Sequence, residues 1–163
     1  MKQKLLAYLV LVVSGIALAY VLVIPASRDS EKPWYAGTEL SAAPYVKLRI
    51  GDGAFVPEDA ILMDSRTLYL SANDTAGFLQ LSPIRDGSVL TISGGNTIEI
   101  DFDAETVLLN GEPLEWYAPA VFNENPYLPL YDTAWYMGVR LEADEATGTV
   151  FYDGSMAAAE DEG

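Results

Sequence analysis

The sequence predicts an α+β fold: an N-terminal transmembrane helix followed by a small, mostly antiparallel β domain with two short helices. Three observations support this prediction. An uncharged run extends from Leu5 to Ile24. Between Tyr45 and Asp153, short alternating apolar segments are broken by Gly, Asn and Asp, as is typical of strands and turns. An internal repeat indicates that the β domain is built from two strand-turn-strand-helix units.

Residues 1–25 are predicted to form a signal anchor. A helix of 20 residues spans about 30 Å, the thickness of the hydrocarbon core of a bilayer. Lys2 and Lys4 precede the apolar run, which favours a cytoplasmic N-terminus. We therefore expect the chain to contact the membrane through residues 5–24, as a single-pass protein of the cell membrane with its C-terminal domain outside. Ala17-Leu18-Ala19 offers an alternative, because cleavage there by signal peptidase would give a secreted protein.

The composition excludes several kinds of chemistry. The chain has 163 residues, with 24 Asp and Glu against 9 Lys and Arg, and it has no His and no Cys. Disulfides, thiolate zinc sites, cysteine nucleophiles, imidazole bases and His-ligated metals are therefore excluded. The acidic balance argues against a nucleic-acid partner, which requires basic residues to neutralise phosphate. We expect no metal site and no cofactor.

The remaining chain divides into three segments. Residues 26–44 are predicted to form a tether, because Pro, Ser, Gly and mixed charges occur there without a sustained period. Residues 45–153 are predicted to form the folded domain. Residues 154–163 are small and acidic, which is typical of a disordered tail. Within the domain, Val89–Ile92 and Thr97–Phe102 flank Ser93-Gly-Gly-Asn96, a hairpin signal.

The repeat appears when the chain is shifted by 58 residues. Ile50–Gly53 then aligns with Leu108–Gly111, and Tyr69–Leu79 aligns with Tyr127–Met137 without a gap. Each unit is expected to contain a short helix whose apolar residues pack on a sheet. One unit alone does not cover its apolar face, so we expect the two units to share one core.

The second unit carries four motifs of a known family: Leu109-Asn-Gly-Glu-Pro-Leu114, Asn123-Glu-Asn-Pro-Tyr-Leu-Pro-Leu130, Asp132-Thr-Ala-Trp-Tyr-Met-Gly-Val139 and Asp144-Glu-Ala-Thr-Gly-Thr-Val150. They resemble the copper amine oxidase N-terminal-like domain, also called the stalk domain, which occurs in bacterial surface proteins. The resemblance covers residues 45–153 and implies an α+β module outside the catalytic core of the oxidase. Amine oxidase activity is not expected, because it requires a His-ligated copper.

Candidate catalytic and metal-binding motifs are weak. Asp101-Phe-Asp-Ala-Glu105, together with Glu112, has the spacing of a calcium loop, but Thr106 stands where such a loop requires Gly. No serine-hydrolase motif occurs. Pairs of carboxylates for cleavage of cell-wall glycan remain open as an alternative, because a chain with 24 acidic residues always offers such pairs.

Aromatic residues suggest a contact surface instead. Trp116 and Tyr117 lie in a predicted loop, and Trp135 aligns with Gly77 of the first unit, so a large side chain is not required there. Exposed aromatic residues often mark interaction sites. The sequence therefore favours a non-catalytic, membrane-anchored module that binds a cell-wall polymer or surface protein, or that acts as a spacer. A carboxylate-dependent hydrolase is the alternative.

Overall fold

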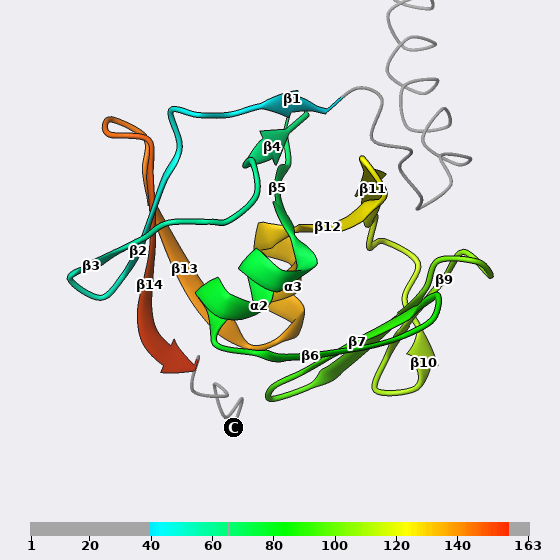
Figure 1. Cartoon of the computed structure of the whole chain (residues 1–163). Helices are drawn as coiled ribbons and strands as arrows, with labels where there is room; N and C mark the ends of the chain where they lie inside the picture. Colours follow the sequence, from blue (N-terminus) through cyan, green and yellow to red (C-terminus); the bar gives the residue numbers. More distant parts are fainter. Residues whose placement is uncertain (1–39, 65, 157–163) are drawn as a thin grey trace, which may run out of the picture. The chain divides into compact units, whose positions relative to one another are not determined.

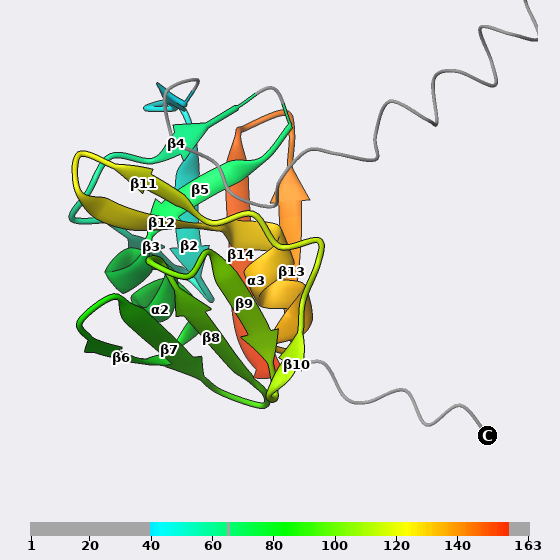
Figure 2. The same ribbon diagram turned by 90° about the vertical axis from the view of Figure 1, so that its right-hand side faces the viewer.

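The computed structural model describes residues 40–64 and 66–156, which form fourteen short strands and two helices in three sheets (Figure 1). Sheet A contains, in spatial order, β1 (Ser41–Ala42), β4 (Leu62–Met63), β5 (Leu68–Ser71), β12 (Asn125–Pro129) and β11 (Ala120–Phe122). Sheet B contains β13 (Val139–Asp144), β14 (Thr149–Met156), β2 (Lys47–Ile50) and β3 (Gly53–Phe55). Sheet C contains β10 (Glu112–Pro113), β9 (Thr106–Leu109), β8 (Thr97–Asp101), β7 (Val89–Ser93) and β6 (Ser82–Asp86), which lie side by side in Figure 2.

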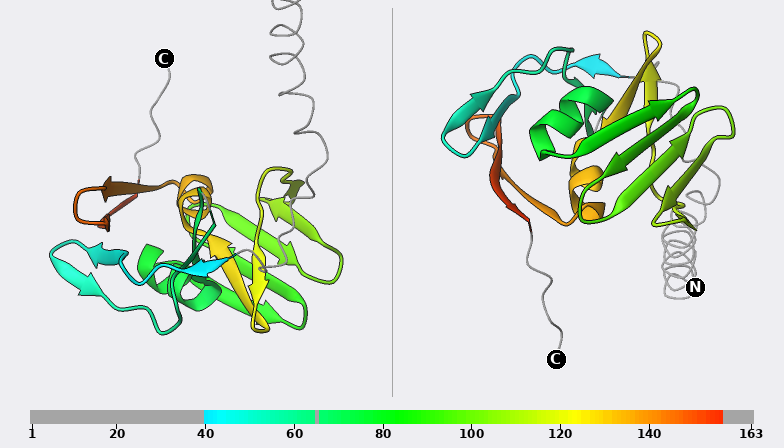
Figure 3. Two further views of the ribbon diagram at one scale, coloured as in Figure 1. Left: turned by 90° about the horizontal axis from the view of Figure 1, so that it is seen from above. Right: turned by 60° about the horizontal axis from the view of Figure 1, so that its bottom comes forward.

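Neighbouring strands in these sheets pair antiparallel, except that β14 and β2 pair parallel. The helices α2 (Ala72–Leu79) and α3 (Leu130–Tyr136) lie between sheets B and C (Figures 1 and 3). The prediction of a small, mostly antiparallel β domain with two short helices is therefore confirmed.

The helices supply the centre of the core. Phe78 of α2 is fully buried, and its ring lies 5.4 Å from that of Phe55 and 6.3 Å from that of Tyr152, both in sheet B. On the other side, sheet C contributes side chains with no exposed surface, among them Ile92 and Ile98. Burying such a side chain stabilises the fold by about 1.5–3 kcal/mol. Sheets B and C do not pair with one another, and the helices between them connect the two sheets through this buried contact.

Local turn signals place the strands as expected. β7 and β8 pair with Ser93 opposite Thr97, so the Gly-Gly turn closes the predicted hairpin. Asn110 and Gly111 have φ values of 53° and 86°, and they join β9 to β10. Glycine and asparagine adopt this left-handed region more readily than other residues, which explains why this turn is visible in the sequence.

The fold extends beyond the predicted domain limits of 45 and 153. Leu40 to Pro44 fall within the predicted tether, but Ala43 is fully buried and β1 pairs with β4. At the other end, β14 continues to Met156. A two-residue strand carries too little pattern to be recognised in the sequence, and its pairing depends on a strand that lies about 20 residues later.

The two helices and the strands that precede them recur at one spacing along the chain. Helix α2 begins at Ala72 and α3 at Leu130, a spacing of 58 residues. Their preceding strands, β5 and β12, pair antiparallel with Leu70 opposite Leu128, so an approximate twofold axis passes between these two residues. Sheet C joins β6 and β7 of the first half to β9 and β10 of the second, while sheet B joins β13 and β14 to β2 and β3.

The predicted membrane segment, residues 5–24, lies outside the described residues, as do most of the tether and the tail from residue 157. Within the part of the chain that the structure describes, neither helix has the length and apolar character needed to cross a bilayer.

Candidate functional site

Among the described residues, the two tryptophans have the most exposed aromatic side chains. The side chain of Trp135 on α3 is 80% exposed, and that of Trp116, in the loop between β10 and β11, is 75% exposed. Tyr131 is also exposed and lies four residues before Trp135. Residues at this spacing lie on the same face of a helix, so Tyr131 and Trp135 share the outer face of α3. We call Trp116, Tyr131 and Trp135 the aromatic surface.

Tyr117, which the sequence analysis placed among the contact residues, does not belong to this surface. It is fully buried, and its hydroxyl lies 2.9 Å from Oγ1 of Thr133. Its ring also packs edge-on against Tyr136, with 6.2 Å between the centroids. Burial raises the pKa of Tyr117 well above its ordinary value.

The burial of Tyr117 has a consequence for its neighbour. The Thr133 hydroxyl donates to the carbonyl oxygen of Pro129 at 2.7 Å, so the Tyr117 hydroxyl must donate to Thr133. These bonds fix the loop against α3. Trp116 is therefore exposed on a segment whose next residue is anchored, which reduces the entropy lost when Trp116 meets a partner.

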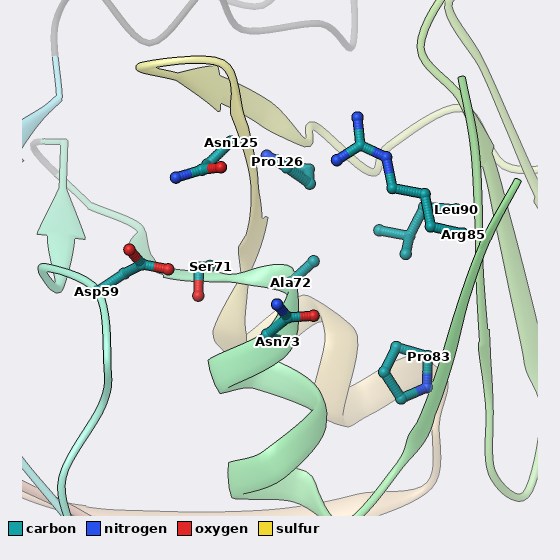
Figure 4. A pocket seen from close by; sticks show the side chains of 9 residues that line it. All are labelled: Asp59, Ser71, Ala72, Asn73, Pro83, Arg85, Leu90, Asn125 and Pro126. Carbon is teal, nitrogen blue, oxygen red and sulfur yellow. The ribbon is translucent and has the colours of Figure 1, made fainter. Parts of the chain in front are cut away.

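A second feature is a pocket of about 160 Å³ where the start of α2 faces β6 and β12 (Figure 4). Four of its lining residues are apolar: Ala72, Pro83, Leu90 and Pro126. Five are polar: Asp59, Ser71, Asn73, Arg85 and Asn125. The pocket therefore carries one cationic and one anionic side chain, with two amides and a hydroxyl.

Asp74 holds one wall of this pocket in place. Its carboxylate, 5% exposed, accepts hydrogen bonds from the backbone N–H groups of Glu58 at 2.8 Å and Asp59 at 3.0 Å. It also accepts the hydroxyl of Ser71 at 2.8 Å, while Ser71 caps α2 by accepting from the N–H of Asp74. The loop that carries Asp59 is thereby tied to the first turn of the helix.

The register of sheet C places the other wall. Arg85 pairs with Leu90 and Pro83 pairs with Ile92, and paired residues share one face of an antiparallel sheet. Arg85 and Pro83 therefore lie on the face of β6 that also carries the core. The guanidinium of Arg85 extends toward Pro126 (Figure 4).

The pocket residues were not predicted from the sequence, because they come from segments far apart in the chain. A signal does exist in the repeat. At a shift of 58 residues, Asp59 aligns with Tyr117, Asn73 with Tyr131, and Arg85 with Ala143. Polar residues in one half thus replace apolar or aromatic residues in the other.

The acidic side chains of the domain are spread over several elements. Among the described residues, no three Asp or Glu side chains converge into a group that would hold a metal ion. Asp101, the first residue of the calcium-like spacing, accepts hydrogen bonds from the N–H groups of Asp103 and Ala104 and from the Ser88 hydroxyl. These bonds, the Ala104 N–H first, hold the pKa of Asp101 below its ordinary value of 3.8.

Comparisons with protein-family models, with curated proteins and with solved structures found no match for this chain. The resemblance to the stalk domain therefore stays a prediction from the motifs of the second half. Functional conclusions rest on the aromatic surface and on the pocket at the start of α2.

Proposed function

We propose that this chain is a membrane-anchored extracytoplasmic module that binds a cell-surface partner without catalysing a reaction. The apolar run 5–24, with Lys2 and Lys4 before it, supports the anchor and its orientation. The motifs shared with the stalk domain support a location at the bacterial surface. Polymers of the cell wall are the first partner to test, and a surface protein is the second.

The exposure of Trp116 and Trp135 is the observation that carries this proposal. An aromatic side chain buries about 150–250 Å² when it is covered, so each exposed tryptophan offers a partner a large apolar contact. The fold does not require Trp135, because Gly77 occupies the matched position in α2. Flat aromatic rings suit the apolar faces of sugar rings, and exposed Glu115 and Asp132 beside them suit hydroxyl or ammonium groups.

The hydrolase alternative lacks a specific observation in its favour. Glycoside hydrolases generally flank the scissile bond with two carboxyl groups that lie roughly 5–9.5 Å apart. Asp59 is the single carboxylate that lines the pocket among the described residues. We therefore propose a binding role and not a glycosidase.

We also propose that the two halves of the domain are repeats of one ancestral unit. Two observations support this view. The sequence matches are 58 residues apart, and the starts of α2 and α3, which follow β5 and β12, are also 58 residues apart. In a repeat, a side chain that differs between matched positions of the two halves is not required by the fold. Such a residue is therefore available for binding.

Binding is tested with the full-length chain in detergent and isolated cell wall, by the fraction of protein that sediments with the wall. The variant carrying both Trp116→Ala and Trp135→Ala is expected to bind at least tenfold more weakly, because aromatic anchors dominate interface energies. Ile84→Ala is the matched control, since Ile84 is also a large exposed apolar residue but lies on β6. Equal binding by all three proteins would contradict the aromatic surface as the contact site.

The orientation is tested in the same preparation of cells. The chain has no Cys, so a single introduced cysteine gives a unique label. Glu145→Cys, in the exposed turn between β13 and β14, is expected to react with a membrane-impermeant maleimide in intact cells, whereas Gln3→Cys is expected to remain unlabelled until the cells are lysed. The opposite pattern would overturn the predicted location.

A further inference from the structure

We propose that the pocket at the start of α2 binds a small zwitterion that carries a carboxylate and an ammonium group, with the size of an amino acid or a dipeptide. The carboxylate lies on Arg85 and the ammonium on Asp59. This site is separate from the aromatic surface and does not depend on the function proposed above.

Arg85 is suited to the carboxylate end. Its Nε–H donates to the carbonyl oxygen of Gly87 at 3.4 Å, and its guanidinium extends toward Pro126 (Figure 4). Within the described residues, Arg140 with Glu142 is the ion pair that the structure shows, so Arg85 has no carboxylate at ion-pair distance. A planar guanidinium with free N–H groups is the donor best matched to a carboxylate, which it binds through two parallel hydrogen bonds.

Asp59 is suited to the ammonium end. Figure 4 shows it across the pocket from Arg85, with its carboxylate directed toward Ser71. Its backbone is held by the bond to Asp74, so the acceptor is positioned before a ligand arrives. The side chains of Asn73 and Asn125 lie around the same space and offer both donors and acceptors to a ligand backbone.

The size and the surrounding charge both favour a small zwitterion. A cavity of about 150 Å³ holds a molecule of roughly the size of benzene, and this pocket of about 160 Å³ is open on one side. The chain carries 24 acidic residues against 9 basic ones, so its field repels a simple anion from a distance. A zwitterion has no net charge and avoids this repulsion, while each of its ends meets an opposite charge.

The other half of the domain shows that the fold does not need these polar groups. At the shift of 58 residues, Asp59 aligns with Tyr117, which is fully buried and whose hydroxyl donates to Thr133. Arg85 is replaced by Ala143 on the matching edge strand β13. A charged residue on the core-side face of an edge strand also prevents edge-to-edge pairing, and that role alone does not account for the acidic and amide groups across the pocket.

The test is a calorimetric and ligand-observed NMR titration of the full-length chain in detergent. The probes are glycine, L-alanine and glycylglycine, with acetate and methylammonium as half-ligands. The zwitterions are expected to bind roughly tenfold more tightly than either half-ligand, because each charged end adds a charge-assisted hydrogen bond. Arg85→Ala is expected to weaken zwitterion binding by roughly tenfold, and Asp59→Asn to reduce it to the level of acetate.

Two controls keep the result interpretable. Arg140→Ala removes an exposed arginine from edge strand β13 outside the pocket, and it is expected to leave binding unchanged. The aromatic variant Trp116→Ala is also expected to bind the zwitterions normally, so failure here and failure of the proposed function are distinguishable. The proposal is overturned if no zwitterion binds, if acetate binds as tightly as glycine, or if Arg140→Ala weakens binding as much as Arg85→Ala.

Discussion

Single residues of this domain show how buried and half-buried carboxylates are held without cations. Asp74 is 5% exposed, and two backbone N–H groups and one hydroxyl replace the water that it loses on folding. Three donors offset much of the cost of burying a charge. Asp101 uses the same arrangement closer to the surface, with three donors on one oxygen.

The hydrogen bonds to Asp101 make the stability of the domain depend on pH. Because hydrogen bonds lower the pKa of Asp101 in the folded state, its contribution is present above the ordinary value of 3.8 and is lost as the pH falls through the folded pKa. Asp101→Asn keeps an acceptor oxygen but removes the charge. The variant is therefore expected to have a lower Tm than the parent at pH 7, and the difference is expected to shrink as the pH falls below 3.8 and through the folded pKa of Asp101.

Thermal unfolding followed by circular dichroism between pH 2.5 and 7 measures this difference. Asp103→Asn is the matched control, since it removes one charge from the same loop and leaves the backbone N–H that bonds to Asp101. A difference for Asp101→Asn that stays constant down to pH 2.5 would show that the charge of Asp101 is not involved.

At the scale of elements, the two helices end differently. Helix α2 ends at Gln80, which has a left-handed backbone with φ 56°, whereas α3 ends at Met137, followed by Gly138 with φ 67°. A left-handed conformation costs a residue with a Cβ roughly 1–2 kcal/mol, and glycine avoids this cost at some loss of entropy. The C-terminal end of α2 therefore carries backbone strain that the end of α3, where Gly138 adopts this conformation, does not.

Exchange of residues between these positions tests the strain. Gln80→Gly is expected to raise the free energy of unfolding by about 1 kcal/mol, and Gly138→Ala to lower it by about 1 kcal/mol. A Cβ on Gly138 would meet no atom within 4 Å, so its effect comes from the backbone alone. Urea unfolding measures both changes, and a destabilised Gln80→Gly variant would mean that the Gln80 side chain makes a stabilising contact.

The elements also show which structural signals are local. The hairpin of β7 and β8 follows from alternating residues around Gly94-Gly95, and the two helices lie within the aligned segments Tyr69–Leu79 and Tyr127–Met137. Tyr117 was wrongly predicted to be exposed, because a loop has no periodic pattern that distinguishes buried from exposed residues. Its burial depends on Thr133, which lies 16 residues later.

At the scale of the whole molecule, pairing between the halves was not predictable. β2 and β14 pair parallel, with Leu48 opposite Val150, although these residues lie about 100 positions apart in the sequence. The alternating pattern of each strand does not indicate which other strand it pairs with. The pocket was missed for the same reason, since its residues meet only after the sheets have formed. The sequence predicts that two repeated units share one core, and one buried cluster in the structure contains both Leu70 and Leu128, whereas the repeat itself stays a prediction.

This exchange of strands between halves predicts that the domain unfolds as one unit. Leu48 is 2% exposed in β2, and Leu48→Ala is expected to lower the free energy of unfolding by about 2–5 kcal/mol through the lost contacts and the cavity. Sheets B and C share the helices as a common core, so amides in both sheets are expected to lose the same protection in native-state hydrogen exchange.

Val56→Ala, at a position that is 81% exposed in the same half, is expected to change stability by less than about 0.5 kcal/mol. Loss of protection in β2, β3 and β14 with unchanged protection in β7 and β8 would instead divide the domain into two units that unfold separately.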